Sequence, residues 1–181
     1  METETAIASK PRVVRAENRV PRWVMPLIKT GVIAVDVCLA AASFFLAFTI
    51  RHGDAIFSTT AWAWSKAFVP YAGILYFAIP VRIAMLIYER AYNYQGAFAY
   101  SREMIKIFKA VSVGSLLMVG WAFLFRGGFA FREFSYSRGV FVLDFAIAFA
   151  LYAAFHLGLR FTQTLFRKKD INLIPTLIVG T

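Results

Sequence analysis

The chain has little of the chemistry that most enzymes and metal sites require. Its 181 residues contain a single cysteine, Cys38, and two histidines, His52 and His156. One cysteine excludes a disulfide within the chain and a zinc site built from several thiolates. The sequence also has no HExxH, GxSxG or GxxxxGK[ST] segment and no carboxylate pair suited to acid–base catalysis. We therefore expect no catalytic residue, no metal site and no bound cofactor in this chain.

Acidic residues are half as frequent as basic ones. Ten Asp and Glu stand against 20 Lys and Arg, which gives a formal net charge of +10. In a soluble chain this excess would indicate a nucleic-acid partner. Here the basic residues flank long apolar runs, which favours anionic lipid and the control of membrane topology. The expected partner is membrane lipid, and no nucleic acid is expected.

Apolar residues are abundant instead. They make up 60% of the chain, aromatic residues make up 17%, and the mean hydropathy is +0.62. A soluble domain is about 45–50% apolar. Four runs are long enough, at about 1.5 Å per residue, to cross the hydrocarbon core of a bilayer as helices. The sequence thus predicts an all-α membrane protein with four transmembrane helices, at 30–50, 67–88, 107–125 and 139–159.

The charged segments between these spans predict the orientation. Four spans place both ends of the chain on one side of the membrane. Segments 1–29, 89–109 and 160–181 carry fourteen Lys and Arg, and the two loops on the other side carry five. The positive-inside rule therefore places both termini in the cytoplasm. The predicted organisation is a basic segment 1–29, a membrane domain 30–159, and a region 160–181 that begins with a basic linker.

Ionisable residues at membrane depth are costly and need partners. Asp36, Arg82 and His156 each lie within roughly 10 Å of the cytoplasmic end of their helix, at about 1.5 Å per residue. We expect an Asp36–Arg82 ion pair with His156 beside it, facing the interior of the bundle. Fixing the register of the helices is the favoured role for this cluster, and a functional site is the alternative.

Asp144 is a fourth ionisable residue in an apolar run, close to the opposite side of the membrane. Its expected partner is Arg138 or Arg51, again in a structural role. Because these charges fall in separate layers, the sequence shows no continuous polar path, and a channel or pump is not expected.

The segment 89–109 alternates aromatic and basic residues. An aromatic belt at the membrane interface is the favoured interpretation. Contact with lipid head groups, undecaprenyl phosphate among them, is the alternative. The candidate contacts for it are Arg90, Arg102, Tyr92 and Tyr100. Association with a second copy through the helices also stays open.

The last residues, 173–181, have the pattern of a buried strand that enters a glycine turn. Such a turn opens a nucleotide-binding βαβ unit, and Gly180 is the candidate for its first glycine. One strand cannot form a sheet by itself. We therefore expect the chain to be the N-terminal part of a longer protein, ending in the first strand of a truncated cytoplasmic Rossmann-like domain. A disordered tail is the alternative.

Several short segments, in order along the chain, carry a resemblance to a known family. They are Asp36 in the first span with Arg51 closing it, Tyr88-Glu89-Arg90, Tyr100-Ser101-Arg102-Glu103, Phe125-Arg126, Phe134-Ser135-Tyr136-Ser137-Arg138-Gly139, Leu159-Arg160 and the final LIVGT. From about residue 23 onward the chain resembles the membrane region of bacterial polyprenyl-phosphate sugar-phosphate transferases. These undecaprenyl-phosphate glycosylphosphotransferases initiate exopolysaccharide, capsule or O-antigen synthesis.

The resemblance implies a membrane-anchoring domain in the bacterial inner membrane. The full-length relative would transfer a sugar-1-phosphate from a nucleotide sugar to undecaprenyl phosphate, with Mg²⁺ in a catalytic domain that this chain lacks. A similar membrane head occurs in nucleotide-sugar epimerase/dehydratases of polysaccharide synthesis, where Gly180 would begin an NAD(P) site. The short linker after Arg160 and the FSYSRG segment favour the transferase. A stand-alone membrane scaffold protein is the third alternative.

Overall fold

A computed structural model of the chain describes residues 23–93, 99–124 and 136–168. The described part contains four long helices and a short hairpin. These elements are α1 (Val24–His52), β1 (Phe57–Ser58), β2 (Ala63–Trp64), α2 (Val69–Tyr88), α3 (Tyr100–Leu124) and α4 (Arg138–Lys168). The predicted strand at 173–181, with Gly180, lies outside the described residues, as do residues 1–22.

All four helices of the described part are long and apolar enough to cross a membrane, which confirms the prediction of four helices of this kind. Three of the four helices extend beyond the apolar runs, whereas α2 begins at Val69, two residues after the predicted start. α1 begins at Val24 and not at 30, α3 begins at Tyr100 and not at 107, and α4 ends at Lys168 and not at 159. A helix can continue into the polar interface because its backbone hydrogen bonds are satisfied internally there too. The apolar run therefore marks the part that lies in hydrocarbon, not the whole helix.

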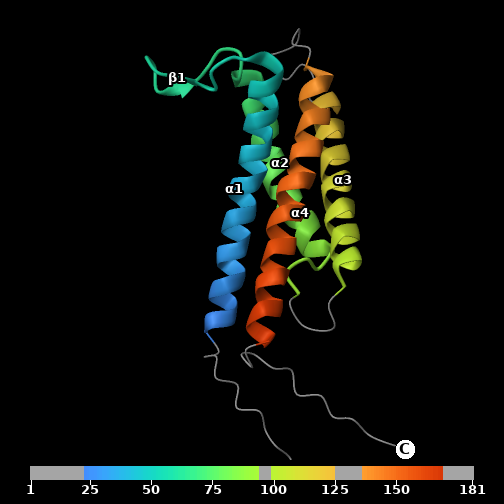
Figure 1. The fold of residues 1–181 in the computed structure, drawn as a ribbon. Coiled ribbons are helices and arrows are strands. Elements are labelled where there is room, and N and C mark those ends of the chain that lie inside the picture. Colours follow the sequence, from blue (N-terminus) through green and yellow to red (C-terminus); the bar gives the residue numbers. More distant parts are fainter. Residues whose placement is uncertain (1–22, 94–98, 125–135, 169–181) are drawn as a thin grey trace, which may run out of the picture.

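The four helices form an antiparallel bundle (Figure 1). Each helix packs mainly on two neighbours, in the order α1, α2, α3, α4 and back to α1. α1 begins and α4 ends at the same end of the bundle, which we call the terminal end (Figure 1). The opposite end, where the hairpin joins α1 to α2, is the hairpin end.

A glycine ends α1 at the hairpin end. Gly53 follows the last helical residue with φ 70°, and its N–H donates to the carbonyl of Thr49 at 2.8 Å. This left-handed conformation is favourable for glycine because it has no Cβ. The chain then leaves the bundle and forms the antiparallel β1–β2 hairpin, in which Phe57 lies opposite Trp64.

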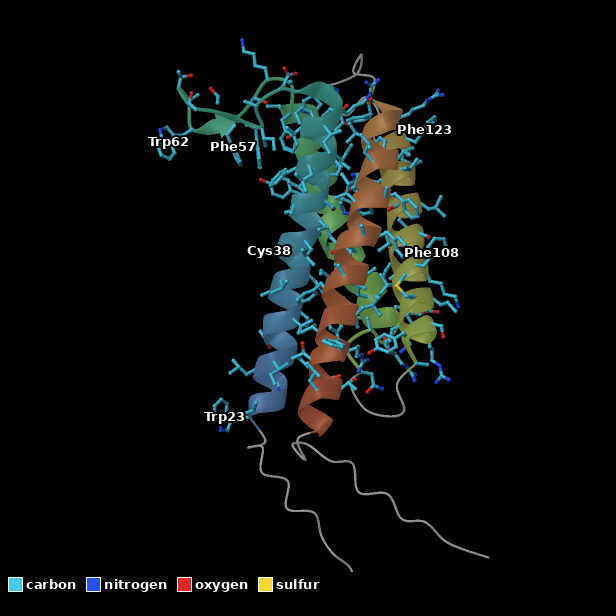
Figure 2. The ribbon with its side chains drawn as sticks, viewed as in Figure 1. Trp23, Cys38, Phe57, Trp62, Phe108 and Phe123 are labelled. Atoms are coloured by element: carbon cyan, nitrogen blue, oxygen red, sulfur yellow. The ribbon has the colours of Figure 1, made fainter. Side chains whose placement is uncertain are left out.

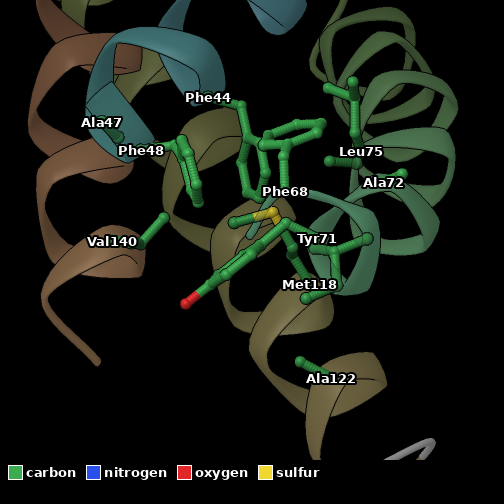
Figure 3. Packing of buried hydrophobic residues seen from close by; sticks show 12 residues of the cluster. Phe44, Ala47, Phe48, Phe68, Tyr71, Ala72, Leu75, Met118, Ala122 and Val140 are labelled. Carbon is green, nitrogen blue, oxygen red and sulfur yellow. The ribbon is translucent and has the colours of Figure 1, made fainter. Parts of the chain in front are cut away.

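The interior of the bundle contains two hydrophobic clusters. The first, the hairpin-side cluster, is rich in aromatic rings, and Phe68 and Tyr71 pack there against Phe48 (Figure 3). The second, the terminal-side cluster, comprises Ala40, Leu86, Ala91, Ile107, Ala110, Val111, Ala148 and Tyr152. No buried residue belongs to both clusters. Polar side chains lie between them, and these define the candidate site.

Candidate functional site

A buried ion pair crosses the bundle between two helices that are not neighbours in the ring. Arg82 of α2 and Asp144 of α4 are 2% and 0% exposed, and their guanidinium and carboxylate groups are joined by a bidentate contact. One arm joins Nη2 to Oδ2, and the other joins Nη1 to Oδ1 at 3.1 Å. The planar, forked guanidinium matches a carboxylate in this way.

A serine of α1 completes this central cluster. Ser43 Oγ accepts a hydrogen bond from Arg82 Nη1 at 2.8 Å and lies 3.0 Å from Asp144 Oδ1 and from the Ala40 carbonyl, within donating distance of both. The guanidinium therefore connects α1, α2 and α4 in one polar layer. Hydrogen bonds in a low-dielectric interior are strong, and an unpaired polar group there is costly. Both terminal nitrogens of the guanidinium are paired in this layer, whereas Arg82 Nε has no hydrogen-bond partner among the described residues.

The sequence places this layer between the two hydrophobic clusters on every helix. Ser43 follows Ala40 of one cluster and precedes Phe44 of the other. Arg82 lies between Ala78 and Leu86, and Asp144 lies between Val140 and Ala148, in each case four residues from either neighbour. Residues four apart share a helix face. On α3 the same level holds a glycine, Gly114, whose Cα leaves room for the Arg82 side chain.

The expected Asp36–Arg82 ion pair is therefore wrong, since Arg82 is paired with Asp144. The estimate of depth used Cα positions alone. A helical side chain leans toward the N-terminus of its helix. On α1 this direction takes Asp36 toward the terminal end, and on antiparallel α2 it takes Arg82 toward the hairpin end. The two side chains lean apart, and the long Arg82 side chain reaches the level of Asp144.

The partners expected for Asp144 are also wrong. Arg138 lies six residues earlier on the same helix, about 240° around its axis, and its side chain is exposed. Arg51 Nε donates to Ser137 Oγ at 3.2 Å and lies over Gly139, at the very end of the bundle. Both arginines thus lie near the surface, and the partner of Asp144 is Arg82 of α2.

A second polar cluster, the Asp36 cluster, lies nearer the terminal end. His156 Nε2 is 3.2 Å from both carboxylate oxygens of Asp36, and these groups are 3% and 0% exposed. The Tyr92 hydroxyl donates to Asp36 Oδ2 at 2.7 Å, and the Tyr152 hydroxyl donates to the Asp36 backbone carbonyl at 2.9 Å. The expectation that His156 lies beside Asp36 in the interior agrees with this geometry.

A third cluster closes the terminal end. Arg160 Nη2 donates to Glu103 Oε1 at 3.0 Å and to the carbonyl of Asn93 at 2.7 Å. Arg160 Nη1 reaches Gln163 Oε1 at 3.2 Å, and Lys106 Nζ lies 3.2 Å from Glu103 Oε1. Glu103 and Arg160 are both buried. The sequence analysis missed this link between α3 and α4, although a carboxylate in the first turn of a helix beside several cations was a usable signal.

The four candidate head-group contacts differ in their exposure. Arg90 is exposed and has φ 55°, and Arg102 and Tyr100 are exposed at the start of α3. Tyr92 is half-buried, and its hydroxyl is directed inward to Asp36. Of these four candidates, three are thus surface residues and Tyr92 belongs to the Asp36 cluster.

Aromatic side chains close the hairpin end of the bundle. The Tyr71 hydroxyl accepts a hydrogen bond from the backbone N–H of Ser137 at 3.0 Å, and the Tyr71 and Tyr136 rings pack edge to face at 5.5 Å. Burial raises the pKa of Tyr136 above its ordinary value of 10.0, because it penalises the charged phenolate. Tyr136 therefore stays neutral across the physiological range.

The chemistry available to these clusters is limited by their burial. Across residues 23–93, 99–124 and 136–168, no three His, Cys, Asp or Glu side chains converge as a metal site would require. A carboxylate and an imidazole such as those of Asp36 and His156 can exchange a proton. Both are enclosed by helices and by Tyr92 and Tyr152. These two side chains are therefore shielded from a substrate in water.

Comparisons of the chain with protein families, with curated proteins and with solved structures gave no match. The four apolar helices define the class of the molecule, a multi-pass membrane protein.

Proposed function

We propose that the chain is the membrane-anchoring domain of a bacterial polysaccharide-biosynthesis sugar transferase. The observation that carries the anchoring role is the internal pairing of buried charge. Arg82 with Asp144, His156 with Asp36, and Arg160 with Glu103 all pair within the described part of the chain. Charges used for transport face a water-filled path, whereas charges that fix helix packing face one another.

The transferase assignment is supported by the resemblance of the chain, from about residue 23 to the LIVGT segment, to the membrane region of these enzymes. In this proposal the bundle lies in the bacterial inner membrane with both termini in the cytoplasm. It holds a cytoplasmic catalytic domain, which would use Mg²⁺, at the leaflet that contains undecaprenyl phosphate. The reaction itself is assigned to that further domain, because Asp36 and His156, the described pair with proton-transfer chemistry, are buried inside the bundle.

The coding DNA beyond the codon for Thr181 tests the assignment directly. A downstream catalytic domain of the sugar-phosphate transferase type is the expected result. A complete GxGxxG domain with a dehydratase motif would make the chain the head of a nucleotide-sugar epimerase/dehydratase, and a stop codon would leave a membrane scaffold protein.

A biochemical test uses membranes that contain either the whole reading frame or residues 1–181 alone. With labelled nucleotide sugars and undecaprenyl phosphate, the whole frame should give labelled lipid in the presence of Mg²⁺, and residues 1–181 should give none. Labelled lipid from purified residues 1–181 would overturn the proposal, because it would require an active site within the bundle.

A further inference from the structure

The β1–β2 hairpin projects sideways from the hairpin end of the bundle (Figure 1). Its two cross-strand pairs have different character. Phe57 lies opposite Trp64, and Ser58 lies opposite Ala63. Because successive side chains point to opposite faces of a strand, one face of the hairpin carries the two aromatic rings and the other carries the two small side chains.

The hairpin is attached to the bundle through its aromatic face. The Trp64 ring stacks on Phe57 with centroids 4.6 Å apart and contacts Phe68 at 4.9 Å and Phe45 of α1 at 6.0 Å. A hairpin with strands of two residues is not stable alone in water. These ring contacts therefore hold it in a fixed position relative to α1 and α2.

Two large apolar side chains on this fixed hairpin are not covered by the bundle. Trp62 is 97% exposed and Phe57 is 54% exposed. Trp62 has φ 49°, a conformation that is rare for a bulky residue. Both rings point from the hairpin in the direction of the terminal end of the bundle (Figure 2). With Ser58 and Thr59 they line a hollow of about 520 Å³.

The position of the hairpin along the bundle indicates what covers these rings. α1 ends at His52 and α2 begins at Val69, so the hairpin lies at the boundary where two membrane-spanning helices leave the hydrocarbon. Tryptophan is enriched at this boundary, because its ring is apolar and its N–H can reach water or head groups. Exposed Arg51 and Lys66 also flank the hairpin, against one exposed carboxylate, Asp54.

We propose that the hairpin is a membrane-interface element that lies on the leaflet at the hairpin end and binds phospholipid beneath it. The rings of Phe57 and Trp62 lie among the upper acyl-chain carbons, and an acyl chain occupies the hollow that they line. Arg51 and Lys66 attract the phosphate groups of the surrounding lipids. This inference requires that α1 and α2 cross the bilayer, and it does not depend on the transferase assignment.

The depth of Trp62 in the bilayer tests the proposal. The variant W23F/W64F/W121F keeps Trp62 as the only tryptophan of the full chain and is reconstituted into phosphatidylcholine vesicles. Lipid brominated near the glycerol backbone should lower the Trp62 emission to roughly half, because the ring lies in the interfacial layer. Lipid brominated near the chain ends should quench it much less, and aqueous iodide should have little effect. The matched variant W23F/W62F/W64F keeps Trp121, inside α3, as a marker of a membrane-spanning position.

Two outcomes would overturn the proposal. Strong quenching by iodide, with none by brominated lipid, would place Trp62 in water. Protection from both quenchers, together with emission that depends on the protein-to-lipid ratio, would place it against a second copy of the chain. If the triple variant does not fold, the same measurement is made on W62C/C38A carrying an environment-sensitive fluorophore. That chain keeps Trp64 and its contacts, and the fluorophore must report an interfacial depth.

Discussion

Arg82 has the largest fully buried side chain among the described residues. Its guanidinium contacts Ser43 of α1 and Asp144 of α4, and all three side chains are buried. A buried pair of this kind contributes little net free energy relative to apolar side chains of the same size. Removal of one partner is different, because the other charge is then left without compensation.

Asp144→Ala should therefore lower the free energy of unfolding by about 3–5 kcal/mol, whereas Arg82→Met with Asp144→Leu should recover most of that loss. Denaturant titration of the purified chain in detergent micelles, followed by circular dichroism, measures both. Asp54→Ala, which removes an exposed carboxylate, is the control and should change stability by less than about 0.5 kcal/mol. Equal effects of Asp144→Ala and Asp54→Ala would contradict the role given to the pair.

Tyr92→Phe tests the Asp36 cluster. The hydroxyl of Tyr92 lies 2.7 Å from the buried Asp36 carboxylate, and its removal should cost about 1–3 kcal/mol in the same titration. Tyr88→Phe is the matched control, because Tyr88 is an exposed tyrosine four residues earlier. If both variants keep the stability of the parent, the Tyr92 hydrogen bond is not part of what holds α1 to this segment.

At the scale of the elements, α3 differs from its three neighbours in the central layer. The other helices supply Ser43, Arg82 and Asp144, while α3 supplies Gly114. A Cβ built on Gly114 would lie 3.5 Å from Arg82 Cγ, which is ordinary van der Waals contact. The position thus accepts a methyl group, and its small size lets α3 lie close to Arg82 of α2.

Gly114→Ala should be tolerated, and Gly114→Leu should lower the free energy of unfolding by about 1–3 kcal/mol, because its branched end would displace the Arg82 side chain. Gly120→Leu is the control on the same helix, where an added Cβ meets no described atom within 4 Å. Thermal unfolding in detergent micelles separates the three variants. An equal loss for the two leucine variants would show that the effect comes from replacing a glycine of α3 by leucine, and not from the contact with Arg82.

At the scale of the whole molecule, the two ends of the bundle have different chemistry. The hairpin end is closed by aromatic rings, among them Tyr71 and Tyr136, and the terminal end is closed by the ion pair of Arg160 with Glu103. The excess of Lys and Arg in the segments assigned to the terminal end favours the cytoplasm for that end, by the positive-inside rule.

Cysteine labelling in intact cells tests this orientation. In a Cys38→Ala background, Thr60→Cys places a thiol on the exposed turn of the hairpin, and Asn93→Cys places one at the terminal end, after α2. A membrane-impermeant maleimide should label the first in intact cells and the second only after permeabilisation, because the basic segments are retained on the cytoplasmic side. The reverse pattern would invert the proposed topology.

Parts of the candidate site were predictable from one-dimensional spacing. The positions of Asp36, Arg82, Asp144 and His156 inside apolar runs follow from the sequence, and all four are buried in the structure. The proximity of Asp36 to His156 also followed, since both lie a few turns from the same end of their helices. The hydrogen bonds of Tyr92 and Tyr152 to Asp36 could not be predicted from the sequence. An aromatic residue near the interface gives the same sequence pattern whether its hydroxyl points outward or inward.

The sequence by itself determined that the described part of the chain has four helices long and apolar enough to cross a membrane. In hydrocarbon the backbone polar groups of an apolar run must be satisfied internally, and a helix does this. The sequence also determined which residues bring charge into that environment. Only the tertiary structure decided that Arg82 is paired with Asp144 and Asp36 with His156. Partner choice depends on the rotation of each helix, its neighbours in the bundle and the lean of each side chain toward the helix N-terminus. Spacing along a single chain contains none of these three quantities.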